Sequence, residues 1–108
     1  MPKKTPDQRE RPPQPELTVR RLGEKPPMIV FEGQTREICF AYNTAILEIS
    51  KREGLKPFHQ ITATGKDVHG PGLHGWEFWA GADESRLEGL FQEIHERAQE
   101  LIERYAGR

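Results

Sequence analysis

The last quarter of the chain carries an apolar stripe at helical spacing, and this stripe constrains the fold more than any other feature of the sequence. Its members recur every three or four residues: Leu87, Leu90, Phe91, Ile94, Ala98, Leu101, Ile102 and Tyr105. Because residues at this spacing lie on one side of an α-helix, the stripe predicts a single amphipathic helix over residues 83–105. Asp83 is a suitable N-cap, and Gly107 is a suitable C-terminal stop. Glutamates and glutamines fill the opposite side, so the stripe is expected to cover another apolar surface.

A second apolar pattern at helical spacing occurs in the middle of the chain. Its members are Ile38, Tyr42, Ala45, Ile46 and Ile49. Thr35 is a candidate N-cap and Gly54 a candidate stop, which favours one long helix between them. The competing interpretation makes residues 36–42 the return strand of a hairpin that turns after Gly33, with a shorter helix behind it. We favour the longer helix and keep the strand as the alternative.

Four segments are rich in strand-forming residues and are bounded by glycine or proline. Residues 17–22 alternate apolar and polar side chains, which is typical of a short edge strand, and residues 28–31 form an apolar run. Residues 58–64 and 76–80 flank a glycine-rich loop, so they predict a hairpin with a long loop. Together with the two helices, these strands predict an α+β fold in the order β-β-α-β-β-α. Both helices are expected on one face of a small, mainly antiparallel sheet.

Composition divides the chain near residue 27. Residues 1–27 hold most of the nine prolines, with seven basic and four acidic residues, so their net charge is +3. The remaining nine basic and thirteen acidic residues give −4, and the whole chain has a net charge of −1. A proline-rich segment with few apolar side chains offsets little of its ordering entropy. We therefore expect residues 1–26 to form a flexible, basic, Pro-rich N-terminal arm and residues 27–108 to form a single α+β domain.

Two tryptophans stand in the last predicted strand. Since side chains alternate between the faces of a sheet, Trp76 and Phe78 are expected on one face and Trp79 on the other. If the helices cover the first face, Trp79 is left on the open face, beside the loop that carries His69 and His74. Aromatic side chains are enriched at binding hot spots, which makes this edge a candidate contact site. The alternative is that the N-terminal arm folds over this face and covers it.

The four histidines and the cysteine form no metal-binding motif. His69 and His74 flank a Gly-Pro-Gly turn and supply at most half of a zinc site. His59, His95 or Cys39 would have to complete the site across the fold, and no CxxC or HxxxH pair is present. We therefore predict no metal ligand.

Catalytic signals are equally weak. A catalytic cysteine needs a stabilised thiolate, whereas Cys39, next to Ile38 in a predicted helix, is expected to be a small buried side chain. The glycine-rich segment 65–75 matches neither the P-loop nor the dinucleotide-binding fingerprint. We predict no catalytic residue and no cofactor.

Cellular location is predicted from what the sequence lacks. The single cysteine excludes an intramolecular disulfide, and small secreted domains more often carry an even set of cysteines. No apolar run is long enough to span a bilayer, and residues 1–15 lack the apolar segment of a signal peptide. The expectation is a cytoplasmic protein without a membrane partner.

These observations predict a non-enzymatic binding or accessory protein that contacts a macromolecular partner, either a protein or a nucleic acid. The contact residues are expected in the basic arm and at the loop–strand edge: Lys3, Lys4, Arg9, Arg11, Arg20, Arg21, His69, His74 and Trp79. The charge of −4 outside the arm argues against broad coating of nucleic acid. Two alternatives come from other classes. One is a small metal-binding protein or metal-dependent enzyme that uses the loop histidines, and the other is a structural homo-oligomer, such as a homodimer, held by the C-terminal helix.

Overall fold

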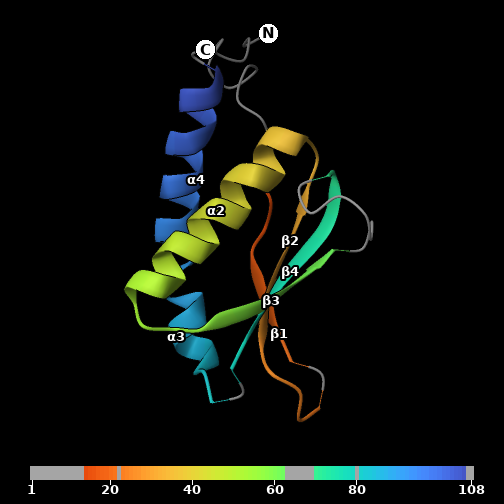
Figure 1. The fold of residues 1–108 in the computed structure, drawn as a ribbon, viewed down its shortest axis with the longest axis vertical. Helices are drawn as coiled ribbons and strands as arrows, with labels where there is room; N and C mark the ends of the chain where they lie inside the picture. The colour runs from red at the N-terminus through yellow and green to blue at the C-terminus, as the bar shows by residue number, and fades with distance from the viewer. Residues whose placement is uncertain (1–13, 22, 63–69, 80, 107–108) are drawn as a thin grey trace, which may run out of the picture.

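The computed structural model describes residues 14–21, 23–62, 70–79 and 81–106 of the 108-residue chain. Figure 1 shows the elements that they form: β1 (Thr18–Arg20), β2 (Met28–Gly33), α2 (Arg36–Arg52), β3 (Pro57–Thr62), β4 (Gly72–Phe78), α3 (Glu84–Glu88) and α4 (Phe91–Ala106). The strands form one antiparallel sheet in the order β1-β2-β4-β3, and α2 and α4 lie side by side next to it. The prediction of a small α+β fold with an antiparallel sheet and two helices is therefore confirmed.

Helix α2 follows the longer of the two predicted courses, since residues 36–42 are helical. Thr35 caps the helix, because its hydroxyl oxygen accepts a hydrogen bond from the Ile38 N–H at 3.2 Å. At the other end Gly54 adopts a φ of 75°, a left-handed conformation that glycine reaches without steric cost. The approach of β2 to α2 requires Gly33, because a Cβ there would overlap the Sγ of Cys39. Cys39 is buried, as the sequence predicted.

The single C-terminal helix predicted over residues 83–105 is wrong in one respect, because the chain forms two helices, α3 and α4. They are separated at Gly89, and glycine has a lower helix propensity than any residue except proline. The Leu90 N–H donates to the Leu87 carbonyl oxygen at 3.1 Å, only three residues back, so the turn is tighter than an α-helical one. Both leucines are still buried in the core. Asp83 caps α3 as predicted, since its Oδ1 accepts a hydrogen bond from the Ser85 N–H at 3.0 Å.

Strand β1 lies within residues 1–26, the segment that the sequence predicts as an N-terminal arm. Strand β1 pairs with β2, and Leu17 beside it is only 6% exposed and belongs to the core. Arg21 donates a hydrogen bond to Glu84 at 2.6 Å, which ties the end of β1 to α3. Leu17 and Val19 bring apolar side chains to the sheet and helices. The rest of the predicted arm includes residues 1–13, which lie outside the described part of the chain.

Strands β3 and β4 pair as the predicted hairpin, but β4 begins at Gly72 rather than at Trp76. The glycines at 70, 72 and 75 had favoured a loop here. Instead, this segment is a central strand that pairs with β2 on one side and β3 on the other, so ladder hydrogen bonds satisfy its backbone groups. His74 lies in this strand rather than in the loop.

The core lies between the sheet and the two long helices. Its largest fully buried side chains include Tyr42 of α2, Phe31 of β2 and Phe78 of β4. The rings of Phe31 and Tyr42 lie 5.6 Å apart, which joins β2 to α2. Trp76 of β4 faces the same side, because its indole N–H donates to the Asn43 side-chain oxygen at 3.0 Å. These contacts identify the face of the sheet that the helices cover.

Candidate functional site

The face of the sheet that points away from the helices is a candidate contact surface. Since Trp76 and Phe78 of β4 point toward the helices, the alternate positions Leu73, Gly75 and Glu77 belong to the opposite face. The strand register places each of them beside a residue of β2, and the next strand, β1, adds residues of its own to the same face. We call this surface the open face, because neither α2 nor α4 covers it. Its described members are Thr18, Arg20, Met28, Val30, Glu32, Leu73, Gly75 and Glu77.

The open face is partly apolar. Leu73 is 41% exposed, while Val30 is almost fully buried and forms part of the floor. A cavity of about 290 Å³ lies here, and it is lined by Glu16, Thr18, Arg20, Val30, Phe31, Glu32 and Leu73. This volume lies just below the usual range of small-molecule pockets. The cavity therefore suits a side chain of a partner better than a free ligand.

Trp79 lies one residue beyond β4 and is 47% exposed. Its indole lies against Gly81, where any Cβ would overlap the ring. The Ala82 N–H donates to the Trp79 carbonyl oxygen at 3.0 Å, which closes a tight turn around this position. The contact with Gly81 restricts the indole, while nearly half of the residue stays accessible. The predicted exposure of Trp79 and shielding of Trp76 agree with this arrangement.

The predicted basic contact residues fall into three groups. Arg20 is exposed at the end of β1 and belongs to the open face. Arg21 instead pairs with Glu84 and donates to the Lys25 carbonyl oxygen at 3.2 Å, so it serves to hold the fold. The remaining predicted residues, Lys3, Lys4, Arg9, Arg11 and His69, lie outside the described residues.

His74 is placed differently from the prediction, because it is fully buried and its side chain is not accessible to a partner. Its ring stacks on Phe31 with the centroids 5.3 Å apart, and its Nε2 lies 2.7 Å from the Gly70 carbonyl oxygen. A carbonyl only accepts, so Nε2 carries the proton in this hydrogen bond. The alternation of β4 explains the burial, since His74 shares the covered face with Trp76. His74 therefore fixes the start of β4 to the core.

A polar cluster that the sequence did not reveal joins α2 to α4. The Tyr42 hydroxyl lies 2.7 Å from His95 Nδ1, and the Gln99 side chain also hydrogen-bonds to this hydroxyl. Burial raises the pKa of Tyr42 to about 12 and lowers the pKa of His95 below its ordinary value. Both groups are therefore neutral near pH 7, and one hydrogen bond joins the phenol to the imidazole. No sequence pattern links two polar residues that are 53 positions apart.

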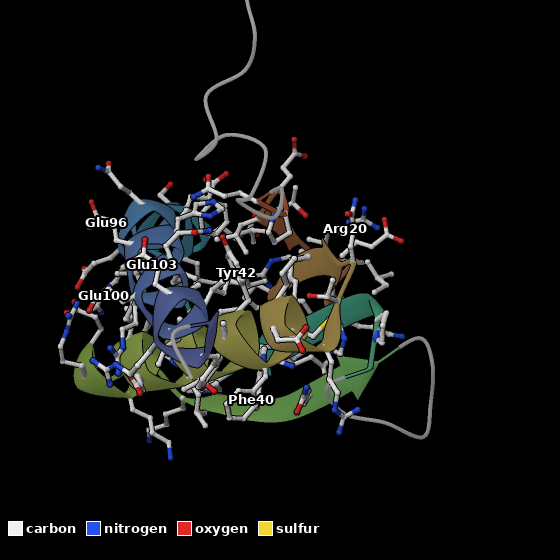
Figure 2. The ribbon with its side chains drawn as sticks, turned by 90° about the horizontal axis from the view of Figure 1, so that it is seen from above. Arg20, Phe40, Tyr42, Glu96, Glu100 and Glu103 are labelled. Carbon is white, nitrogen blue, oxygen red and sulfur yellow. The ribbon has the colours of Figure 1, made fainter. Side chains whose placement is uncertain are left out.

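Next to this cluster, α4 and Gln14 line a groove of about 750 Å³, which we call the acidic groove. It is lined by Gln14, Gln92, His95, Glu96, Gln99, Glu100 and Glu103. Figure 2 shows the three glutamates together along one side of α4, with Arg20 on the other side of the molecule. The sequence predicts glutamates and glutamines on this side of the helix but gives no sign of a groove.

The described residues contain no group of three or more His, Cys, Asp or Glu side chains placed to hold a metal ion. None of the described helices has the length and apolar character needed to cross a membrane. Comparison with protein-family models, with curated proteins and with solved structures finds no match to this chain. Its function therefore has to be inferred from its own residues.

Proposed function

We propose that this chain is a non-enzymatic binding protein that contacts a protein partner through the open face of its sheet and Trp79. One observation carries the proposal: α2 and α4 cover one face of the sheet, while the other face carries Leu73 and ends near a half-exposed, restricted Trp79. A restricted tryptophan loses little side-chain entropy on binding, which is one reason why tryptophan is frequent at hot spots.

Charge favours a protein over a nucleic acid as the partner. The exposed charges around the cavity of the open face are Glu16, Arg20 and Glu32, so carboxylates outnumber the guanidinium. Carboxylates repel a phosphate backbone. They complement a protein surface that presents apolar side chains together with lysine or arginine. The basic residues of the arm, Lys3, Lys4, Arg9 and Arg11, were also predicted as contact residues, but the proposed contact is made by the open face and Trp79. A cytoplasmic location is likewise proposed, on the basis of a single, buried cysteine.

The test compares Trp79→Ala with Phe40→Ala. Phe40 is a matched control because it is 39% exposed, close to the value for Trp79, but lies on α2 rather than on the sheet. We expect the immobilised Trp79→Ala chain to bind its partner at least about tenfold more weakly than wild type, as loss of a hot spot requires. Phe40→Ala should retain wild-type binding. Thermal unfolding of both variants checks that the fold is intact.

The same capture experiment identifies the class of partner. Proteins captured by wild type and by Phe40→Ala, but not by Trp79→Ala, in the presence of nuclease support the proposal. Equal capture by all three chains contradicts it. Capture that disappears with nuclease indicates a nucleic-acid partner instead. A steep salt dependence indicates the same, since the logarithm of the affinity falls with the logarithm of the salt concentration by about one unit for each phosphate contacted.

A further inference from the structure

We propose that the acidic groove on α4 is the docking site of the chain's own N-terminal segment, residues 1–13, and that Arg9 and Arg11 make the principal contacts. The described chain leads into this groove, since Gln14 lines it together with residues of α4. The thirteen residues that precede Gln14 therefore start at the site itself. This role goes beyond the partner binding assigned to the open face.

The charges of the groove suit a basic segment. Among the residues that the structure describes, Glu96 and Glu103 have no ion-pair partner, and Glu100 pairs only with Arg97 at 3.5 Å. Arg97 is shared, because it also donates to Glu48 at 2.9 Å. The other polar groups that line the groove are three glutamines and the neutral His95. Among the described residues that line the groove, none is a lysine or arginine that would compete with an incoming arginine.

The N-terminal segment carries the complementary charge. It contains Lys3, Lys4, Arg9 and Arg11 against Asp7 and Glu10, a side-chain net charge of +2. An arginine fork can donate two hydrogen bonds to one carboxylate, and the glutamines offer further acceptors.

Distance selects Arg9 and Arg11 over the two lysines. At about 3.3–3.6 Å per residue, Arg11 reaches about 10 Å from Gln14 and Arg9 about 17 Å. The glutamates from Glu96 to Glu103 span about 10 Å at the helical rise of 1.5 Å per residue. All sixteen residues of α4 span about 24 Å, whereas a straight segment carries Lys4 about 30 Å or more from Gln14. The two arginines therefore match the groove, and the lysines reach beyond it.

Proline lowers the cost of this docking. Pro12, Pro13 and Pro15 surround Gln14 and fix φ near −65°, so the chain enters the groove with few conformations to lose. A stiff connection also keeps the two arginines close to the carboxylates and raises their effective concentration at the site. This stiff connection therefore favours an intramolecular contact over a contact with another molecule.

The test places a spin label at residue 8 through Gln8→Cys in the full chain and measures paramagnetic broadening of backbone amide signals. The native Cys39 is fully buried and is protected from the reagent. At low salt, the amides of Glu96, Glu100 and Glu103 should lose more than half of their intensity. Salt at about 0.5 M should restore them, because screening shortens the range of charge interactions. Unchanged α4 signals at low salt overturn the proposal.

Two double substitutions separate arginine docking from general attraction. Arg9→Glu with Arg11→Glu should abolish the broadening, and the control, Lys3→Glu with Lys4→Glu, should leave most of it although the charge change is the same. Equal loss of broadening in both variants overturns the assignment to the arginines.

The double substitution Glu96→Gln with Glu103→Gln changes only exposed side chains and should abolish the broadening without loss of the fold. Broadening in a mixture of labelled chain and unlabelled ¹⁵N chain shows docking onto a second copy and contradicts the intramolecular contact.

Discussion

At the scale of the residue, the pair Tyr42 and His95 shows how burial controls protonation. The hydrogen bond between the Tyr42 hydroxyl and His95 Nδ1 joins a neutral phenol to a neutral imidazole. Burial shifts both equilibria toward these forms, since it raises the pKa of Tyr42 to about 12 and lowers that of His95. The contact between α2 and α4 therefore depends on pH at both ends of the range.

We expect the free energy of unfolding to fall on the acidic side and on the alkaline side. The unfolded chain binds a proton at His95 more readily than the folded chain, so stability is present above pH 6.5 and is lost as the pH falls below it. The folded chain keeps the Tyr42 proton longer, so stability is lost as the pH rises from about 10 toward 12. A shift of two pKa units corresponds to about 2–3 kcal/mol at the alkaline end.

Urea unfolding of wild type and Tyr42→Phe at pH 5, 7 and 10.5 measures this dependence. Tyr42→Phe should cost about 1 kcal/mol at pH 7, where the hydrogen bond to His95 is lost. The difference between the two chains should shrink or reverse at pH 10.5, where only wild type has the phenol of Tyr42 to ionise. If the difference in free energy of unfolding between the two chains stays constant with pH, Tyr42 does not cause the loss of stability at alkaline pH.

At the scale of the element, glycine has opposite roles at two helix ends. Gly54 has a φ of 75°, and an added Cβ would meet nothing within 4 Å, so only its backbone conformation requires glycine. Gly89 has a φ of −64° and a ψ of −14°, which every residue tolerates, and its Cβ would meet only the carbonyl oxygens of Arg86 and Ser85 at 3.4 Å. Their sequence contexts look alike, since each follows a run of helix-forming residues.

Alanine at the two positions should therefore change stability in opposite directions. Gly89→Ala should stabilise the protein by up to about 1 kcal/mol, because alanine loses less backbone entropy on folding. Gly54→Ala should destabilise it by about 1–2 kcal/mol, because the left-handed conformation strains alanine. Thermal unfolding resolves both, since about 1 kcal/mol shifts the Tm of a domain of this size by roughly 4–8 °C. Changes of the same sign would show that the two backbone conformations are not as described.

The elements also show which features a sequence pattern can predict. The capping of α2 by Thr35 and the stop at Gly54 are local, and both were predicted correctly. The interruption at Gly89 was not, because the apolar stripe continues across it. His74 was assigned to a loop because local glycines outweighed the pairing of β4 with strands far away in the sequence. Non-local contacts such as Tyr42 with His95 leave no periodic signal at all.

At the scale of the whole molecule, β1 connects the start of the described chain to the core. Leu17 lies in the core, β1 extends the sheet at the side of β2, and Arg21 pairs with Glu84. Composition alone placed this segment with the proline-rich arm, since its neighbours on both sides are prolines and charged residues. In the structure Leu17 is buried and the partly buried Val19 packs against the same core.

Two truncations should therefore differ sharply. Removal of residues 1–13 should change the free energy of unfolding by no more than about 1 kcal/mol, since it removes exposed ion pairs at most. Removal of residues 1–21 should cost at least about 2–5 kcal/mol, because the loss of a buried leucine alone has this effect. Chemical denaturation of both chains measures the difference. Similar stabilities would move the boundary back toward residue 26.

The placement of the two tryptophans on either side of β4 has a consequence for spectroscopy. Trp76 is partly buried and hydrogen-bonded to Asn43, so its fluorescence reports on the integrity of the covered face. Trp79 is accessible, so iodide should quench it selectively in the folded chain. A partner seated on the open face near Trp79 should protect this emission and leave that of Trp76 unchanged. The protein thus carries separate intrinsic reporters for unfolding and for binding.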